Sequence, residues 1–300
     1  MHFTTTSSRP SGSGGASKET SPDSALPSTE VIEALGKWLQ DHRPVVVALS
    51  GGVDSAVMAS LAFQFLDSDA VAVTGISPSL SLEERRAAQQ SAVAVGIRHL
   101  EITTNELSRA GYRANAGDRC YHCKSELYDT ILSVEELQQH TILDGAQASD
   151  VAGDRPGMKA SGERGVESPL RIFGIDKTQV RALALQRQLP SWDRPARPCL
   201  ASRVPVGTEV DSELLEKVEV LELFLSRQGF LIYRARCSEA RVVIEIDAQE
   251  LSTQQGGDWR RRLDALARSL GFNQRWLDKR GYGGTGAPLL EPLFLELQYG

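Results

Sequence analysis

The segment from Val45 to Ser55 constrains the fold of this chain more than any other. It reads Val-Val-Val-Ala-Leu-Ser-Gly-Gly-Val-Asp-Ser, and its apolar start has the continuous hydrophobicity of a strand covered on both faces. The alanine-rich run from Asp54 to Ala62 is typical of a helix with a largely buried face. The residues between Ser50 and Ser55 therefore form a short turn from a buried strand into a helix.

This turn has the properties of a phosphate-binding loop. Gly51 and Gly52 can adopt positive φ and bring backbone N–H groups close to an anion. The N-terminus of the following helix adds unpaired donors and about half a positive charge, which suits pyrophosphate. The alternative is an ordinary glycine-rich turn. The motif G-x-x-x-x-G-K-S/T is absent from the turn, so the sequence predicts ATP binding without transfer of the γ-phosphate.

Composition narrows the class of protein. The chain has 300 residues, of which 41% are hydrophobic and 24% charged, enough for one sizeable core or two smaller ones. A net charge of -6 argues against nucleic acid as the main partner and favours a small ligand. No apolar stretch approaches the roughly 20 residues that span a bilayer, and the N-terminus lacks the apolar core of a secretion signal. We therefore expect a cytoplasmic protein.

Helix and strand signals alternate along residues 28–205, which predicts an α/β fold with a parallel sheet and helices on both faces. Residues 1–27 are rich in Ser, Thr, Gly and Pro, and we expect them to be disordered. Besides the loop region, the expected strands cover residues 70–76, 98–102 and 140–143, and the expected helices cover residues 30–41, 120–132 and 176–188 and a run after Ser81.

The pattern changes in residues 206–300, which predict a smaller α+β domain. It contains expected helices over residues 211–227 and 259–270, expected strands over residues 230–236 and 241–247, and a last extended stretch. The tail from residue 287 is apolar enough to dock on a neighbouring subunit or on its own domain.

Cysteine placement is the second strong signal. Cys120 and Cys123 form a C-x-x-C motif, which in a cytoplasmic chain indicates redox chemistry or metal binding before a structural disulfide. Cys199 is flanked by Arg197 and Arg203, which would favour its thiolate form. Three thiolates can hold a four-iron four-sulfur cluster with one iron left open. The alternative is a set of buried, inert thiols.

Several motifs together resemble known proteins. The order Ser-Gly-Gly-Val-Asp-Ser resembles the PP-loop of the ATP pyrophosphatase superfamily. Further segments are similar to motifs of the LarE family. They are Asp-Arg-Cys-Tyr-His-Cys-Lys at 118–124, Ile-Leu-Asp-Gly-Ala-Gln-Ala-Ser-Asp at 142–150 with Gly-Asp-Arg-Pro-Gly at 153–157, and Pro-Cys-Leu-Ala-Ser-Arg at 198–203. Its members are ATP-dependent sulfur transferases, some of them sacrificial, that serve assembly of the nickel-pincer nucleotide cofactor of lactate racemase.

The resemblance implies a two-stage reaction. ATP adenylates a carboxylate of pyridinium-3,5-dicarboxylate mononucleotide with loss of pyrophosphate, and sulfur then displaces AMP to give a thiocarboxylate. Asp54 would be catalytic and would help to place Mg²⁺. The residues implied in ATP binding are Ser50, Gly51, Gly52, Val53, Asp54, Ser55, Asp144 and Gly145.

The resemblance leaves two sulfur sources open. In the sacrificial route, Cys199 is catalytic, gives up its own sulfur and becomes dehydroalanine. In the other route, Cys120, Cys123 and Cys199 bind a four-iron four-sulfur cluster whose open iron carries a sulfide. We favour the cluster because a sulfur donor protein could reload it, whereas a consumed cysteine works once. Family members also form homo-oligomers, which implies a role for the C-terminal domain in substrate binding and oligomerisation.

The substrate carries a phosphate and carboxylates, for which arginine offers planar bidentate donors. The candidates are Arg197, Arg203, Arg234 and Arg236, with a solvated strand edge as the alternative for the last two. Asp150 and Asp154 follow a predicted strand and are further candidates for substrate or Mg²⁺ binding, with turn formation as the alternative.

The sequence departs from the family pattern at one position. Gly283 stands where the family tends to have an arginine, which puts one substrate or subunit contact in doubt.

Three alternative functions remain open. A PP-loop tRNA thiolase would share the adenylation and the cysteines, but the chain shows no added basic domain. An amide ligase of the NAD or GMP synthetase type would give Cys199 no role. A nucleotide-binding regulatory protein would bind ATP without releasing pyrophosphate.

Overall fold

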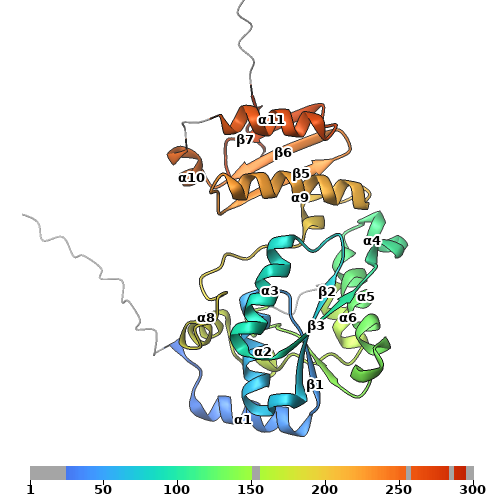
Figure 1. Cartoon of the computed structure of the whole chain (residues 1–300), viewed down its shortest axis with the longest axis vertical. Helices are drawn as coiled ribbons and strands as arrows, with labels where there is room; N and C mark the ends of the chain where they lie inside the picture. The colour runs from blue at the N-terminus through green and yellow to red at the C-terminus, as the bar shows by residue number, and fades with distance from the viewer. Residues whose placement is uncertain (1–24, 151–155, 255–257, 284–286, 295–300) are drawn as a thin grey trace, which may run out of the picture.

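A computed structural model describes residues 25–150, 156–254, 258–283 and 287–294. Figure 1 shows an N-terminal α/β region with a second, smaller α+β region stacked at one end of it. The expected disorder of residues 1–27 concerns mostly residues 1–24, which lie outside the described residues. Among the described helices, none is long and apolar enough to cross a membrane.

The N-terminal region contains a four-stranded sheet of order β3-β2-β1-β4 in which all neighbouring strands are parallel. This arrangement confirms the predicted α/β fold. Its strands are β1 (Val45–Ala48), β2 (Ala70–Ile76), β3 (Arg98–Thr103) and β4 (Thr141–Leu143). The helices of this region are α1 (Thr29–Asp41), α2 (Val53–Leu66), α3 (Leu82–Val95), α4 (Ala110–Ala114), α5 (Arg119–Ser133), α6 (Pro156–Glu163), α7 (Pro169–Ile172) and α8 (Lys177–Gln186).

Strand β1 is apolar throughout because both faces of the sheet are covered. Val45 and Val47 belong to the core formed with α1, α2 and α8, whereas Val46 belongs to the core on the other face, which includes Tyr128 and Ile131 of α5. Successive side chains of a strand point to opposite faces, so the valine run supplies both cores. This packing holds the carboxyl end of β1, and the loop after it, in place.

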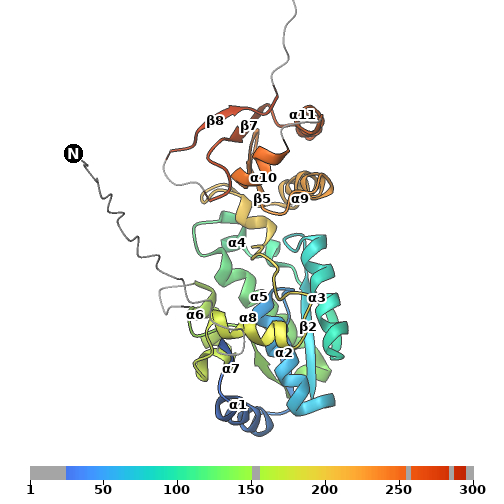
Figure 2. The same cartoon turned by 90° about the vertical axis from the view of Figure 1, so that its left-hand side faces the viewer.

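The C-terminal region contains a mixed sheet of order β5-β6-β7-β8. Figure 2 shows α9 and α11 on the same side of this sheet, and both helices contribute to its buried core. The strands are β5 (Tyr233–Ser238), β6 (Arg241–Ile246), β7 (Gln274–Asp278) and β8 (Leu290–Pro292), and the helices are α9 (Ser212–Arg227), α10 (Ala248–Thr253) and α11 (Trp259–Ser269).

The segment after Cys199 joins the two regions. Leu200 and Val204 are buried in the C-terminal core, while the backbone N–H of Leu200 donates to the Ser79 carbonyl, 3.0 Å away, in the loop after β2. The amide of Asn115 donates to the carbonyl of Pro205 at 2.8 Å. Cys199 therefore lies at the junction of the nucleotide-loop region and the C-terminal region.

Several predicted boundaries differ from the structure. The first C-terminal strand begins at Tyr233 and not at Phe230, whose side chain is buried against α11 by a ring contact with Trp259. The helix expected over 176–188 ends at Gln186, because Gln188 has a φ of 53°. Helix α6 was missed because its polar, glycine-containing sequence has no clear apolar period.

We expect Leu221→Ala to lower the free energy of unfolding by about 2–5 kcal/mol, because Leu221 of α9 is fully buried in the C-terminal core. Urea denaturation measures the change as a lower midpoint at an unchanged m value. The matched control is Leu231→Ala, whose side chain is 66% exposed, and which should cost no more than about 0.5 kcal/mol. Equal costs for the two variants would contradict this core assignment.

Candidate functional site

A cavity of about 560 Å³ lies at the carboxyl ends of β1, β2 and β4. Such an edge is where ligands bind in open α/β sheets. The cavity brings together residues that the sequence keeps far apart: the nucleotide loop, the turn after β4, and the cysteines. Its lining includes Ser50, Gly52, Asp54, Ser55, Asp144, Gly145, Asp150, Cys120, Cys123 and Cys199.

The nucleotide loop holds its own shape. The backbone N–H of Ser50 donates to the Ser55 hydroxyl oxygen at 3.1 Å, and that hydroxyl donates to the Gly52 carbonyl at 3.0 Å. Gly52 is the N-cap of α2 and supplies no capping side chain, while Val53 anchors the first turn in the core. The first N–H groups of α2 therefore have no side-chain cap and suit an anionic ligand.

Two glycines allow the backbone to approach closely at this point. Gly51 has a φ of 83°, and a Cβ added to it would lie 2.6 Å from the carbonyl oxygen of Glu84. A Cβ on Gly145 would lie 2.6 Å from the backbone nitrogen of Ser55. Any side chain at either position would force the loop, α3 and the turn after β4 apart. Gly145 lines the cavity, whereas Gly51 packs against α3 and fixes the loop from behind.

Asp54 is held by a cation that the sequence analysis missed. The Nζ atom of Lys177 lies 2.8 Å and 2.6 Å from the two carboxylate oxygens of Asp54. Lys177 is the first residue of α8, so two helix N-termini meet here. The lysine places a cation beside Asp54, which itself lines the cavity. Nothing in the local pattern around Lys177 indicated this role, because the pairing spans 123 residues.

Asp144 is the centre of a buried polar network at the end of β4. It accepts hydrogen bonds from the Ser168 hydroxyl at 2.7 Å and from the backbone N–H of Ala146 at 3.1 Å. The ammonium group of Lys124 lies 3.1 Å from it. Burial acts to raise the pKa of Asp144, but Lys124 and these hydrogen bonds hold it below its usual range. Asp144 therefore fixes the turn that carries Gly145 and also presents Lys124 to the cavity.

The three cysteines lie on one cavity wall in different environments. Cys120 is exposed, whereas Cys123 and Cys199 are partly buried. Burial raises the pKa of Cys199, although Arg119 and Arg203 act in the opposite direction. Arg203 therefore acts on Cys199 in the expected direction, but burial outweighs it, and Arg197 bonds Glu83 instead.

The positions of the three cysteines bear on the predicted iron–sulfur cluster. Among the described residues, no three His, Cys, Asp or Glu side chains are grouped so that they could hold one metal ion. The thiolates of a four-iron cluster bind separate irons, so they need to face one cavity without meeting at a point. The three thiols line a single cavity, which is the feature that a cluster hypothesis would rest on.

Three of the four predicted substrate arginines are paired with carboxylates. Arg197 bonds Glu83, Arg236 bonds Glu245, and Arg203 forms a buried ion pair with Glu222 at 2.7 Å. These pairs give each of the three a role in packing the C-terminal region.

Arg234 differs from the other three. Its guanidinium lies over the Tyr282 ring and donates to the Tyr282 hydroxyl at 2.7 Å. No carboxylate pairs with it among the described residues, and its buried Nε has no hydrogen-bond partner there. Close by, a second cavity of about 220 Å³ is lined by Arg197, Arg203, Tyr233 and Tyr282.

The predicted acidic residues and Gly283 are placed as follows. Asp150 lines the main cavity and accepts from the backbone N–H of Gln147 at 3.0 Å. Asp154 lies outside the described residues. Gly283 has a φ of 74° with open space around it. An arginine would adopt this conformation only with strain, so the departure from the family pattern extends to the backbone.

Two charged residues near the cysteines were not predicted. Glu106 is only 2% exposed, lines the main cavity and accepts from the hydroxyls of Ser77 and Ser79. Arg119 acts on the pKa of Cys199 and bonds Asn115. Neither has an ion-pair partner among the residues described. The position of Glu106 just after β3, at the ligand-binding edge of the sheet, is the signal that would have found it.

Comparison with known proteins agrees with this geometry. Residues 29–116 match the family model described as asparagine synthase. The chain is 37% identical to the uncharacterized protein slr1717 of Synechocystis, over 84% of this chain and 94% of that protein. It is 31% identical to the pyridinium-3,5-bisthiocarboxylic acid mononucleotide synthase of Lactiplantibacillus plantarum, over 81% and 88%.

A tRNA(Ile)-lysidine synthase of Rhodococcus erythropolis is 29% identical over 57% of this chain and 55% of that protein. Its shorter coverage contrasts with the nearly full-length match to the mononucleotide synthase. Together with the cavity that joins a PP-loop to the cysteines, these similarities identify an ATP-using enzyme that belongs to the LarE family of the PP-loop superfamily.

Proposed function

We propose that this enzyme adenylates a carboxylate of pyridinium-3,5-dicarboxylate mononucleotide and converts it to a thiocarboxylate. The observation that carries the proposal is the single cavity lined by both the PP-loop and Cys120, Cys123 and Cys199. An adenylated carboxylate formed at the loop would not have to leave the cavity to meet a sulfur atom. The name of the Lactiplantibacillus relative supports the choice of substrate.

The first step is adenylation. A carboxylate oxygen of the substrate attacks the α-phosphorus of ATP, the bond to the bridging oxygen breaks, and pyrophosphate leaves. The uncapped N–H groups of α2 and the Lys177 ammonium stabilise the charge on pyrophosphate. Asp54 would hold the Mg²⁺ of the bound nucleotide, which supplies further neutralisation of the phosphates.

The second step transfers sulfur. In the sacrificial route the Cys199 thiolate attacks the acyl carbon, a thioester forms, and AMP leaves with one oxygen of the original carboxylate. Loss of the Cys199 Cα proton then breaks its Cβ–Sγ bond, so the thiocarboxylate departs with the sulfur and dehydroalanine remains. Because burial raises the pKa of Cys199, this route needs a bound substrate or another group to favour the thiolate.

The cluster route uses the same cysteines. Cys120, Cys123 and Cys199 would hold a four-iron four-sulfur cluster, which when bound supplies a sulfide nucleophile. The protein's part in this route is to hold the adenylate against the three thiolates and to exclude water from the acyl carbon. Cys237 has no part in either route, because it is buried in the C-terminal core.

The anionic groups of the substrate need cations beyond the PP-loop. Arg234 offers a guanidinium without a carboxylate partner among the described residues, and its buried Nε is a donor still to be satisfied. Arg197 and Arg203 line the neighbouring small cavity, where they remain substrate candidates while bonded to Glu83 and Glu222. Arg236, Asp150 and Asp154 also remain candidates for substrate binding.

The proposal also includes the enzyme's localisation, oligomeric state and pathway. We place the enzyme in the cytoplasm, as a homo-oligomer that makes a nickel-pincer nucleotide cofactor for lactate racemase. A sulfur donor protein would reload the cluster if that route operates. Neither nucleic acid nor a membrane takes part in the proposed reaction.

We expect Asp54→Asn to reduce pyrophosphate release by about 100-fold or more, because the amide loses the charge that binds Mg²⁺ and pairs with Lys177. The assay supplies ATP, Mg²⁺ and the mononucleotide and measures pyrophosphate. The fold should change in stability by no more than about 1 kcal/mol, since Asp54 is partly exposed in the first turn of α2. The matched control is Asp69→Asn, in an exposed pair with Arg43. Normal release by Asp54→Asn would remove this residue from the mechanism.

Cys199→Ala should still release pyrophosphate but should form no thiocarboxylate, because both routes need the sulfur at this position while adenylation does not. Pyrophosphate and the product mass are measured in the same reaction. Cys237→Ala is the control and should keep both steps, since its sulfur contacts only the C-terminal core. Thiocarboxylate formation by Cys199→Ala at the normal rate would rule out both routes.

A further inference from the structure

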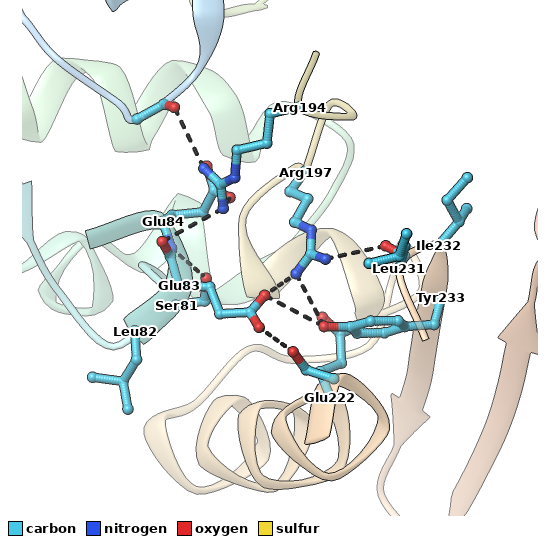
Figure 3. Close-up of polar contacts among 12 residues, drawn as sticks. Ser81, Leu82, Glu83, Glu84, Arg194, Arg197, Glu222, Leu231, Ile232 and Tyr233 are labelled. Atoms are coloured by element: carbon cyan, nitrogen blue, oxygen red, sulfur yellow. Dashed lines mark hydrogen bonds and ion pairs between the residues drawn. The ribbon is translucent and has the colours of Figure 1, made fainter. Parts of the chain in front are cut away.

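The first turn of α3 lies directly against the nucleotide loop. A Cβ on Gly51 would come within 2.6 Å of the Glu84 carbonyl oxygen, so the two backbones are in contact. The first turn of α3, which carries Glu83 and Glu84, is therefore held in a fixed position relative to the loop. Figure 3 shows their side chains reaching toward two arginines of the segment that leads to Cys199.

Arg194 makes the contact with the loop. Its Nη2 lies 2.7 Å from the Glu84 carboxylate, and Glu84 is only 8% exposed. Its Nη1 lies 3.4 Å from the Gly51 carbonyl oxygen, and its Nη2 lies 3.5 Å from the Glu83 carbonyl. One guanidinium thus holds both the nucleotide loop and the start of α3.

Arg197 makes the corresponding contact with the C-terminal region. It bonds the Glu83 carboxylate, donates to the Tyr233 hydroxyl at 3.0 Å and donates to the Leu231 carbonyl at 3.1 Å. Glu83 also accepts from the Ser226 hydroxyl of α9. The two adjacent glutamates therefore divide the contacts, with Glu84 on the nucleotide side and Glu83 on the C-terminal side (Figure 3).

Cys199 lies just beyond these two anchors. On its other side, the Leu200 N–H donates to the Ser79 carbonyl at 3.0 Å, and Arg203 donates to the Pro198 carbonyl at 2.7 Å. The contacts of Leu200 and Arg203 tie the cysteine to the loop after β2 and to the C-terminal core. Among the residues described, Arg194 is the part of this segment that bonds to the nucleotide loop itself.

We propose that Arg194 is a positioning residue that holds Cys199 in register with the nucleotide loop, so that sulfur transfer depends on an occupied loop. The inference deepens the proposed function and partly rests on it. Bound phosphates bring negative charge to the loop that Arg194 contacts and compete with Glu84 for its guanidinium. In the proposal, the described arrangement, with Arg194 on Glu84, is the one without nucleotide, and the phosphates favour a second arrangement in which the guanidinium turns toward them, as a ligand-dependent change requires.

The test compares Arg194→Ala with Arg194→Lys and with a matched control, Arg181→Ala. Arg181 donates to the Trp192 carbonyl at 2.9 Å, so it bonds the same segment without contacting the loop. The first readout is thiocarboxylate formed per pyrophosphate released. We expect this ratio to fall about 10- to 100-fold in Arg194→Ala, as for a misplaced reacting group. Arg194→Lys should be intermediate, and Arg181→Ala should match the wild type.

The second readout needs no mononucleotide. Iron-free protein is treated with iodoacetamide, with and without ATP and Mg²⁺, and alkylation of the Cys199 peptide is followed by mass spectrometry. We expect the nucleotide to change the rate by at least about fivefold in the wild type and in Arg181→Ala, and to have no effect in Arg194→Ala.

The outcomes separate the two proposals. An equal nucleotide response in Arg194→Ala and in the wild type, or an unchanged product ratio, overturns the role of Arg194. An alkylation response that is present in the wild type and lost in Arg194→Ala supports that role, and if the wild type then releases no pyrophosphate with the mononucleotide, the proposed substrate alone is contradicted. A merely structural role would lower thermal stability and both activities together, without changing their ratio.

Discussion

The site depends on close backbone packing around the N-terminus of α2. Gly51 lies against the carbonyl of Glu84, and Gly145 lies against the nitrogen of Ser55, so three segments meet with no room for a side chain. Because Gly52 is the N-cap, the first N–H groups of the helix have no side-chain cap and suit phosphate. It also brings the turn after β4, with Asp144 and Lys124, to the same cavity. Every other proposed role uses this arrangement.

Charge pairing around the cavity separates residues that hold the structure from those left for a ligand. Removing one partner of a buried pair such as Arg203 and Glu222 would leave an uncompensated charge, which costs about 3–5 kcal/mol. Arg234, Arg119 and Glu106 have no ion-pair partner among the described residues. Glu106 lines the cavity that holds the cysteines, Arg119 is the neighbour of Cys120, and Arg234 bonds Tyr282, which lines the second cavity.

The sequence predicted local features well and long-range partners poorly. The range 70–76 coincides with β2, and Ser81 caps α3 by accepting from the Glu84 N–H, because strand hydrophobicity and capping are local signals. The pairing of Lys177 with Asp54 and the contact of Arg194 with Gly51 span more than 120 residues, so no periodicity could indicate them. For the same reason, both arginines next to Cys199 were expected to act on its thiol, whereas Arg203 does so while paired with Glu222, and Arg197 pairs with Glu83. Their carboxylate partners come from other elements.

The most direct test of the account follows oxygen through one turnover. The mononucleotide is labelled with the heavy oxygen isotope in its carboxylates, and AMP, pyrophosphate and the product are analysed by mass spectrometry. The account predicts that AMP gains one labelled oxygen, that pyrophosphate gains none, and that the product contains one sulfur in place of that oxygen. Unlabelled AMP beside a thiocarboxylate would show that sulfur transfer does not pass through an acyl adenylate, and it would contradict the central claim.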